Sequence, residues 1–169
     1  MVGSEREGDE SAKTHTIRPL TPADEPFLWE ILYQAIYVPP GSAPPERDIV
    51  KRPQIAKYVR DRGQHPDDTG FIAIDSDSQQ PIGAIWVRLL RGENRGYGYV
   101  DDATPELTMA VLPQYRGRGV GTSLLIHLLQ AAWGRYPAIS LSVAPENPAL
   151  RLYKRLGFEV AARSGTSLT

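Results

Sequence analysis

A short glycine-rich run constrains the fold of this chain more than any other feature of its sequence. The run covers residues 114–122 and reads Gln-Tyr-Arg-Gly-Arg-Gly-Val-Gly-Thr, with glycine at three alternate positions. Glycine lets a backbone turn sharply and approach a ligand with no Cβ in the way, so successive N–H groups can converge on one anion. A helix that begins here adds unpaired N–H groups and the positive end of its dipole. The run therefore predicts a pyrophosphate-binding site.

The flanking segments set the context of this loop. Residues 106–111 read as a strand, and apolar residues recur at helical spacing from Gly121 to Trp133, so the order is strand, loop, helix. A Walker loop would place a lysine after its last glycine, but Thr122 follows Gly121 directly. A dinucleotide-binding loop would need a third glycine where Thr122 stands and an acidic end to the next strand, which the segment 138–143 lacks. A nucleotide-binding protein is therefore disfavoured.

A second segment, residues 142–159, contains the boundaries of a short helix. Asn147 is a good N-cap, Pro148 fits the first helical position, and Gly157 fits the left-handed residue that follows a helix. The i, i+3, i+4 spacing predicts one shared face for Ala149, Leu152, Tyr153 and Leu156. By itself this pattern is also typical of a core tyrosine whose hydroxyl lies at the rim.

Taken together, the two segments resemble the GCN5-related N-acetyltransferases (GNAT). The glycine loop contains Arg116-x-x-Gly119-x-Gly121, similar to the acetyl-CoA pyrophosphate loop (Gln/Arg)-x-x-Gly-x-(Gly/Ala) of that family, and residues 142–159 are similar to its second signature. The resemblance implies a mixed α+β fold. Its mostly antiparallel sheet would splay between the strand before the glycine loop and the next strand, and about four helices would flank it.

The resemblance also implies direct transfer of the acetyl group of acetyl-CoA to a primary amine of a small molecule or peptide, in a ternary complex and without a metal. By matching position, Tyr153 would protonate the leaving thiolate, and Asn147 would contact the pantetheine arm. A backbone N–H of strand 107–111 would stabilise the oxyanion, with no single donor singled out. The implied cofactor-binding residues are Met109, Val111, Arg116, Gly117, Arg118, Gly119, Val120, Gly121, Thr122, Asn147 and Tyr153.

Three carboxylates compete for the role of the base that deprotonates the amine: Asp101, Asp102 and Glu106. Glu106 is favoured because it opens the strand before the glycine loop, where related enzymes often place a glutamate, and the two aspartates are the alternatives. A solvated acidic entry to the strand would also explain all three, and even then they would attract a cationic amine. A non-catalytic acyl-CoA sensing module is the alternative function, since it would need the loop but neither Tyr153 nor Glu106.

Composition bounds the other possibilities. With 169 residues, 41% of them hydrophobic, we expect one domain at 14–169 after a disordered lead-in at 1–13. Lys and Arg (19) nearly balance Asp and Glu (20), so no nucleic-acid partner is expected. There is no cysteine, and His15, His65 and His127 are scattered, so no metal site is expected. No apolar run approaches roughly 20 residues, so we expect a cytoplasmic protein without a membrane partner. The resembling family often dimerises, which leaves a homodimer open.

The remaining elements follow from periodicity and from turn residues. Strands are expected at 16–20, 71–75, 82–90, 138–143 and 158–162, and a very short or cut final strand at 167–169. Helices are expected from 21 to 35 and from 46 to 62, the second one interrupted at Pro53. In the resembling family, the region between these helices borders the acceptor site, so the proline-dense loop 37–45 is expected there.

Overall fold

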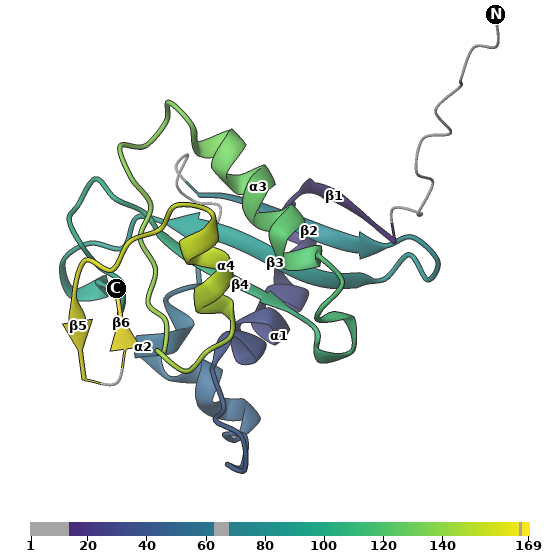
Figure 1. Ribbon diagram of the computed structural model, residues 1–169, viewed down its shortest axis with the longest axis horizontal. Coiled ribbons are helices and arrows are strands. Elements are labelled where there is room, and N and C mark those ends of the chain that lie inside the picture. The colour runs from purple at the N-terminus through teal and green to yellow at the C-terminus, as the bar shows by residue number, and fades with distance from the viewer. Residues whose placement is uncertain (1–13, 63–67, 166) are drawn as a thin grey trace, which may run out of the picture.

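A four-stranded antiparallel sheet forms the centre of the computed structural model, which describes residues 14–62, 68–165 and 167–169 (Figure 1). The strands β1 (His15–Pro19), β2 (Thr69–Asp75), β3 (Pro81–Arg88) and β4 (Glu106–Val111) follow one another in the order β1-β2-β3-β4. The four strands expected in these regions are confirmed, with β3 ending at Arg88. The expected lead-in, residues 1–13, lies outside the described residues.

Helices surround this sheet. The α-helices are α1 (Glu25–Ala35), α2 (Pro53–Ala56), α3 (Val120–Ala132) and α4 (Ala149–Arg155). The 3-10 turns are η1 (Pro22–Asp24), η2 (Arg47–Lys51), η3 (Gly92–Asn94) and η4 (Pro113–Tyr115). A hairpin of β5 (Arg163–Ser164) and β6 (Ser167–Leu168) ends the chain. No helix among the described residues is long and apolar enough to cross a membrane.

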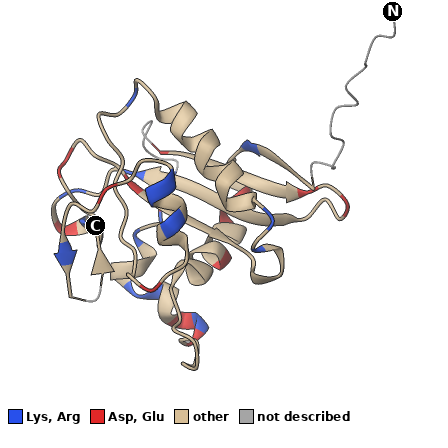
Figure 2. Ribbon diagram, in the orientation of Figure 1, with Lys and Arg blue, Asp and Glu red and all other residues tan. Residues whose placement is uncertain are grey.

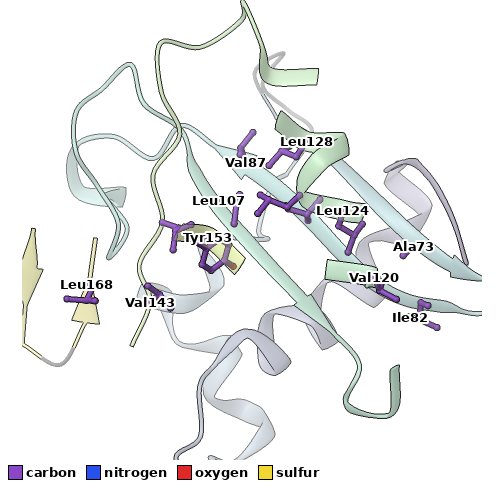
Figure 3. Packing of buried hydrophobic residues seen from close by; sticks show 13 residues of the cluster. Ala73, Ile82, Val87, Leu107, Val120, Leu124, Leu128, Val143, Tyr153 and Leu168 are labelled. Carbon is purple, nitrogen blue, oxygen red and sulfur yellow. The ribbon is translucent and has the colours of Figure 1, made fainter. Parts of the chain in front are cut away.

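The two faces of the sheet are covered by different helices, because successive side chains of a strand point to opposite faces. On one face, Ile85, Val87 and Leu107 pack in a core with α3 and α4 (Figure 3). On the other face, Trp86 and Ala110 pack with α1. The expected mixed α+β fold, with a mostly antiparallel sheet flanked by helices, is confirmed.

The sheet splays where the next strand was expected. Glu106 and Ser140 form a single parallel bridge, in which the Leu107 N–H donates to the Ser140 carbonyl at 2.8 Å. Val143 pairs with Leu168 instead, on the side away from β4. The prediction of a regular strand at 138–143 is therefore wrong, because its two ends pair with different neighbours and no continuous ladder forms. The segment leaves β4 after Ser140.

The prediction of a helix at 46–62 is also wrong for most of this range. Arg52 is extended, as expected for a residue before proline, so η2 and α2 are separate. After Ala56 the chain forms turns, because side chains of β3 take the backbone carbonyls that a helix would use. Arg88 Nη1 donates to the carbonyls of Lys57 (2.8 Å) and Arg60 (2.6 Å), and Trp86 Nε1 donates to the carbonyl of Tyr58 (2.8 Å).

The C-terminal part departs from expectation in two further places. Residues 158–162 form no regular strand, and only Ala161 and Ala162 bond to Thr169, so the strand predicted here is wrong. The helix α4 begins at Ala149 and not at Pro148, although the Asn147 side chain still accepts the Ala149 N–H at 3.0 Å. Gly157 has φ +99°, the left-handed conformation expected after the helix.

Replacing Arg88 by methionine should strongly destabilise the protein. Arg88 is only 7% exposed, pairs with buried Asp68 and binds the carbonyls of the turns at 57–61. Removing one partner of a buried ion pair costs about 3–5 kcal/mol, because the other charge stays buried. We expect a loss of about this size in urea unfolding followed by tryptophan fluorescence. The exposed Arg60→Met should change stability by less than about 0.5 kcal/mol, and equal effects would contradict the anchoring role.

Candidate active site

The glycine loop has the conformation that its sequence predicts. Gly117 and Gly119 have φ +74° and +80°, in the left-handed region that favours glycine. No heavy atom of the described chain lies within 4 Å of the place that a Cβ would take at either position. The backbone of the loop is therefore open to a ligand on this side.

The N-terminus of α3 lies directly behind this loop. The Ser123 N–H donates to the Gly119 carbonyl at 3.0 Å, which is the first helical bond in this region. The N–H groups of Val120, Gly121 and Thr122 precede it, and the first amides of an α-helix have no partner within the helix. These amides and the positive end of the helix dipole provide the donors and the field that an anion needs.

Arginines surround the same place. Figure 2 shows basic residues on the loop before α3 and on α4. Arg116 Nε donates to the Val111 carbonyl at 3.0 Å, and the Arg118 guanidinium lies 5.5 Å from the centre of the Tyr115 ring. Arg155 of α4 reaches Thr122 Oγ1 at 3.5 Å. Arg155 is absent from the residues predicted above, because no spacing rule links residues 33 positions apart on separate helices.

The outer edge of β4 is open beyond its one bridge. The N–H of Leu112 donates to the Ile82 carbonyl of β3 at 2.8 Å, and the N–H of Leu107 points the other way, to Ser140. In an antiparallel pair these directions alternate, so the N–H groups of Met109 and Val111 also point away from β3. The Leu107 N–H is occupied by Ser140, and Met109 provides the next outward donor along the strand.

Tyr153 lies beside this open edge, in the core between α4 and the sheet. Its side chain is 6% exposed, and Figure 3 places it between Leu107 of β4 and Val143. The Phe158 ring meets it edge-on, with 5.7 Å between ring centres. Burial raises the pKa of Tyr153, which keeps the hydroxyl protonated and able to donate.

Glu106 approaches the same edge from the other face, because it precedes Leu107 in the strand. Glu106 is only 3% exposed. Its carboxylate oxygens accept the N–H groups of Gly96 and Gly98, both at 2.9 Å. The Tyr58 hydroxyl lies 3.5 Å from Oε1. Burial raises the pKa of Glu106, while the two backbone N–H groups oppose this rise.

The two aspartates differ from Glu106 in their surroundings. Asp101 and Asp102 are both exposed. Asp101 accepts the Ala103 N–H at 2.9 Å, and hydrogen bonds from Thr104 and Ala103 hold its pKa below the ordinary value. Asp102 accepts the Tyr99 hydroxyl at 2.8 Å. The structure therefore separates one buried carboxylate from two solvated ones that bond within their own loop.

No cluster of three potential metal ligands occurs within residues 14–62, 68–165 and 167–169. His127 is exposed on α3, and its Nδ1 lies 2.9 Å from the Ser123 carbonyl oxygen. His15 lies in β1, and His65 lies outside the described residues. The described histidines thus lie away from the Glu106 carboxylate.

Sequence analysis missed the residues that hold Glu106. Tyr58 comes 48 positions earlier in the chain, and it contacts Glu106 from a segment that forms turns where a helix was predicted. A second long-range contact joins the loop expected to border the acceptor to the turn before α4, where the Tyr37 hydroxyl donates to the Glu146 carbonyl at 3.2 Å. Neither contact has a signal in local sequence patterns.

Comparison with known proteins bears on the family and the fold of the chain. The profile of the acetyltransferase (GNAT) family matches residues 29–158, whereas no curated protein sequence matches the chain. Among solved structures, an aminoglycoside N-acetyltransferase with a CoA-containing bisubstrate analogue has a TM-score of 0.61 at 19% identity, over 89% of this chain and 95% of that one. The spermidine/spermine N-acetyltransferase SpeG of Vibrio cholerae gives 0.54 at 21% identity, over 88% and 81%. NAA60 of Arabidopsis thaliana gives 0.55 at 23%, over 88% and 86%. These likenesses establish the fold.

Proposed function

We propose that this chain, which belongs to the acetyltransferase (GNAT) family and is an acetyl-CoA-dependent acetyltransferase, transfers the acetyl group directly to a primary amine of a small molecule or peptide. The observation that carries the proposal is the open outer edge of β4, with Glu106 on one face of the strand and Tyr153 on the other. Two of the structural relatives are named for aminoglycosides and for spermidine and spermine, which are amines.

The residues near α3 suit the pyrophosphate of CoA. Free amides at the start of the helix, two glycines without a Cβ and the guanidinium groups of Arg116, Arg118 and Arg155 all favour a polyanion. From there the pantetheine arm would follow the open edge of β4, where Met109 and Val111 present their backbones, towards the turn that contains Asn147. Binding at a distance from the thioester would fix its orientation and lower the entropic cost of reaction.

Three groups of the chain would carry the chemistry. Glu106 takes a proton from the ammonium, and the amine nitrogen then forms a bond to the carbonyl carbon. The Met109 N–H donates to the carbonyl oxygen as negative charge develops there. When the carbon–sulfur bond breaks, Tyr153 gives its proton to the thiolate, and the nitrogen loses its second proton, which restores the Tyr153 hydroxyl. Free CoA and an amide result, and the proton held by Glu106 passes to solvent.

Among the carboxylates, Glu106 has the surroundings that a base requires. Two backbone N–H groups fix the direction of its oxygens, and burial raises its pKa towards the range in which proton transfer is efficient. Asp101 and Asp102 would act as an exposed negative surface that attracts a cationic acceptor.

Release of free CoA tests the proposed function. The purified protein would be incubated with acetyl-CoA and a panel of polyamines, amino acids, aminoglycosides and peptides with free N-termini, with thermal shift by acetyl-CoA measured in parallel. An amine-dependent signal supports the transferase and identifies the acceptor class. A thermal shift without turnover on any amine would favour the alternative, a non-catalytic acyl-CoA sensing module.

Removing the Tyr153 hydroxyl should separate turnover from binding. In Tyr153→Phe the ring still packs against Phe158, so we expect acetyl-CoA affinity within about twofold of the wild type. A lost general acid typically lowers the rate by about a hundredfold or more, so kcat should fall to that extent. Isothermal titration calorimetry and steady-state kinetics measure the two effects. An equal loss of affinity and turnover would contradict the assignment of Tyr153 as the acid.

A carboxylate in the glycine loop should abolish binding of acetyl-CoA. Gly119→Asp places a negative charge where the pyrophosphate is expected, next to the α3 amides. Gly134→Asp is the matched control, because Gly134 has φ +79°, close to the +80° of Gly119, and an equally open Cβ position at the other end of α3. Both variants place an aspartate at nearly the same left-handed φ. Calorimetry should detect binding only in Gly134→Asp, and loss in both variants would mean that strain alone explains the effect.

A further inference from the structure

Side chains of the sheet hold the turns at 57–61 in place. Trp86 and Arg88 lie on the same face of β3, and their side chains bind the carbonyls of Lys57, Tyr58 and Arg60 at 2.6–2.8 Å. Both side chains are buried. The position of Tyr58 is therefore fixed by the core of the protein and does not depend on the short helix α2 alone.

The Tyr58 hydroxyl makes two contacts. Its oxygen accepts the Tyr97 N–H at 2.8 Å, and it lies 3.5 Å from Glu106 Oε1. A phenol has a single hydrogen to donate, and the contact with an N–H uses a lone pair. The hydrogen is therefore left for the carboxylate. Burial and the neighbouring Glu106 charge raise the pKa of Tyr58, so the hydroxyl remains a donor.

Glycine is required where these groups meet. A Cβ at Gly96 would lie 2.1 Å from Glu106 Oε1 and 2.4 Å from the Tyr58 hydroxyl. At Gly98 it would lie 2.7 Å from the backbone carbon of Leu141. The loop 96–98 thus wraps closely around the carboxylate and presents its N–H groups to Glu106 and Tyr58. We call Tyr58, Gly96, Tyr97, Gly98 and Glu106 the carboxylate cluster.

Resting on the base role proposed above for Glu106, we propose that Tyr58 is a positioning residue that orients the Glu106 carboxylate and keeps it ionised at neutral pH. Burial disfavours the ionised form of Glu106, and few groups counteract this effect of burial. Besides the Gly96 and Gly98 amides, these are Lys57 on the same turn as Tyr58 and the Tyr58 hydroxyl itself, which both lower the pKa of Glu106. Arg88 is the cross-strand neighbour of Glu106 on β3, and the Tyr97 N–H donates to the Tyr58 hydroxyl.

The direction of the effect follows from these contacts. A hydrogen bond donated to the charged form of a carboxyl group stabilises that form and lowers its pKa. Loss of the Tyr58 hydroxyl should therefore raise the pKa of Glu106, and a base that is protonated cannot accept the proton of the amine. Tyr58 would thus influence the reaction without touching the acceptor.

Tyr58→Phe tests the proposal, with Tyr136→Phe as the control that removes a hydroxyl beyond the far end of α3. Carbon-13 NMR of the side-chain carboxyl groups gives the titration midpoint of Glu106 without any substrate, with its resonance assigned from Glu106→Gln. The midpoint should rise in Tyr58→Phe and stay unchanged in Tyr136→Phe. With an amine that supports turnover, kcat/KM below the new midpoint should fall about three- to tenfold and recover at higher pH.

The outcomes distinguish this proposal from the one on which it rests. An unchanged Glu106 midpoint in Tyr58→Phe overturns the positioning role, even if Glu106→Gln is inactive. A shifted midpoint together with full activity of Glu106→Gln overturns the base role, and with it any effect of Tyr58 on the reaction. Should Tyr58→Phe fail to fold, Tyr58→Leu provides a second test, since it also removes the hydroxyl that faces Glu106 Oε1 and should raise the midpoint in the same direction.

Discussion

The site depends on one pair of backbone hydrogen bonds, between residues 105–107 and Ser140. Ser140 donates to the Pro105 carbonyl at 3.0 Å and accepts the Leu107 N–H at 2.8 Å, and the two segments then separate. A continuous ladder would have occupied the outward N–H groups of β4 with a neighbouring strand. Because the ladder stops after one bridge, the backbone at Met109 and Val111 is left at an open edge inside the protein. An otherwise regular sheet therefore has an edge strand whose outward N–H groups are available to an extended ligand.

The alternation of side chains along β4 gives this edge two chemically different sides. Leu107 points towards α3 and α4, where Tyr153 is buried among apolar residues. Glu106 points the other way, towards the loop 96–98 and the turns at 57–61. The strand thus separates the two groups that we propose as acid and base. Tyr153 is kept neutral by its apolar surroundings, and the Glu106 carboxylate is surrounded by hydrogen-bond donors from other segments.

Local patterns in the sequence predict a large part of this arrangement. Alternate glycines, the helical spacing of α3 and the limits of α4 are properties of neighbouring residues. The structure has the glycine loop, both helices and the left-handed Gly157, although α4 begins at Ala149, one residue later than predicted. The wrong predictions concern segments whose conformation depends on contacts with residues far away in the sequence. Residues 57–62 have a helical pattern, but Arg88 and Trp86 of β3 bind their carbonyls, and residues 138–143 look like a strand, yet their two ends pair with different partners. The cluster around Glu106 joins residue 58 to residues 96–98 and 106 through tertiary contacts, so no local pattern contains it.

The turn that contains Tyr58 and the proline-dense loop 37–45 are anchored to different extents. The turn with Tyr58 is fixed to β3 through buried side chains, so the surroundings of Glu106 are coupled to the core of the protein. The proline-dense loop 37–45 is held more lightly, by the Tyr37 hydroxyl on the Glu146 carbonyl and by the Tyr33 hydroxyl on the Pro45 carbonyl at 2.7 Å. Changes in this loop would therefore cost little stability and would leave the carboxylate cluster in place. If loop 37–45 borders the acceptor, as the family resemblance implies, the proposed choice of amine can change without disturbing the proposed base.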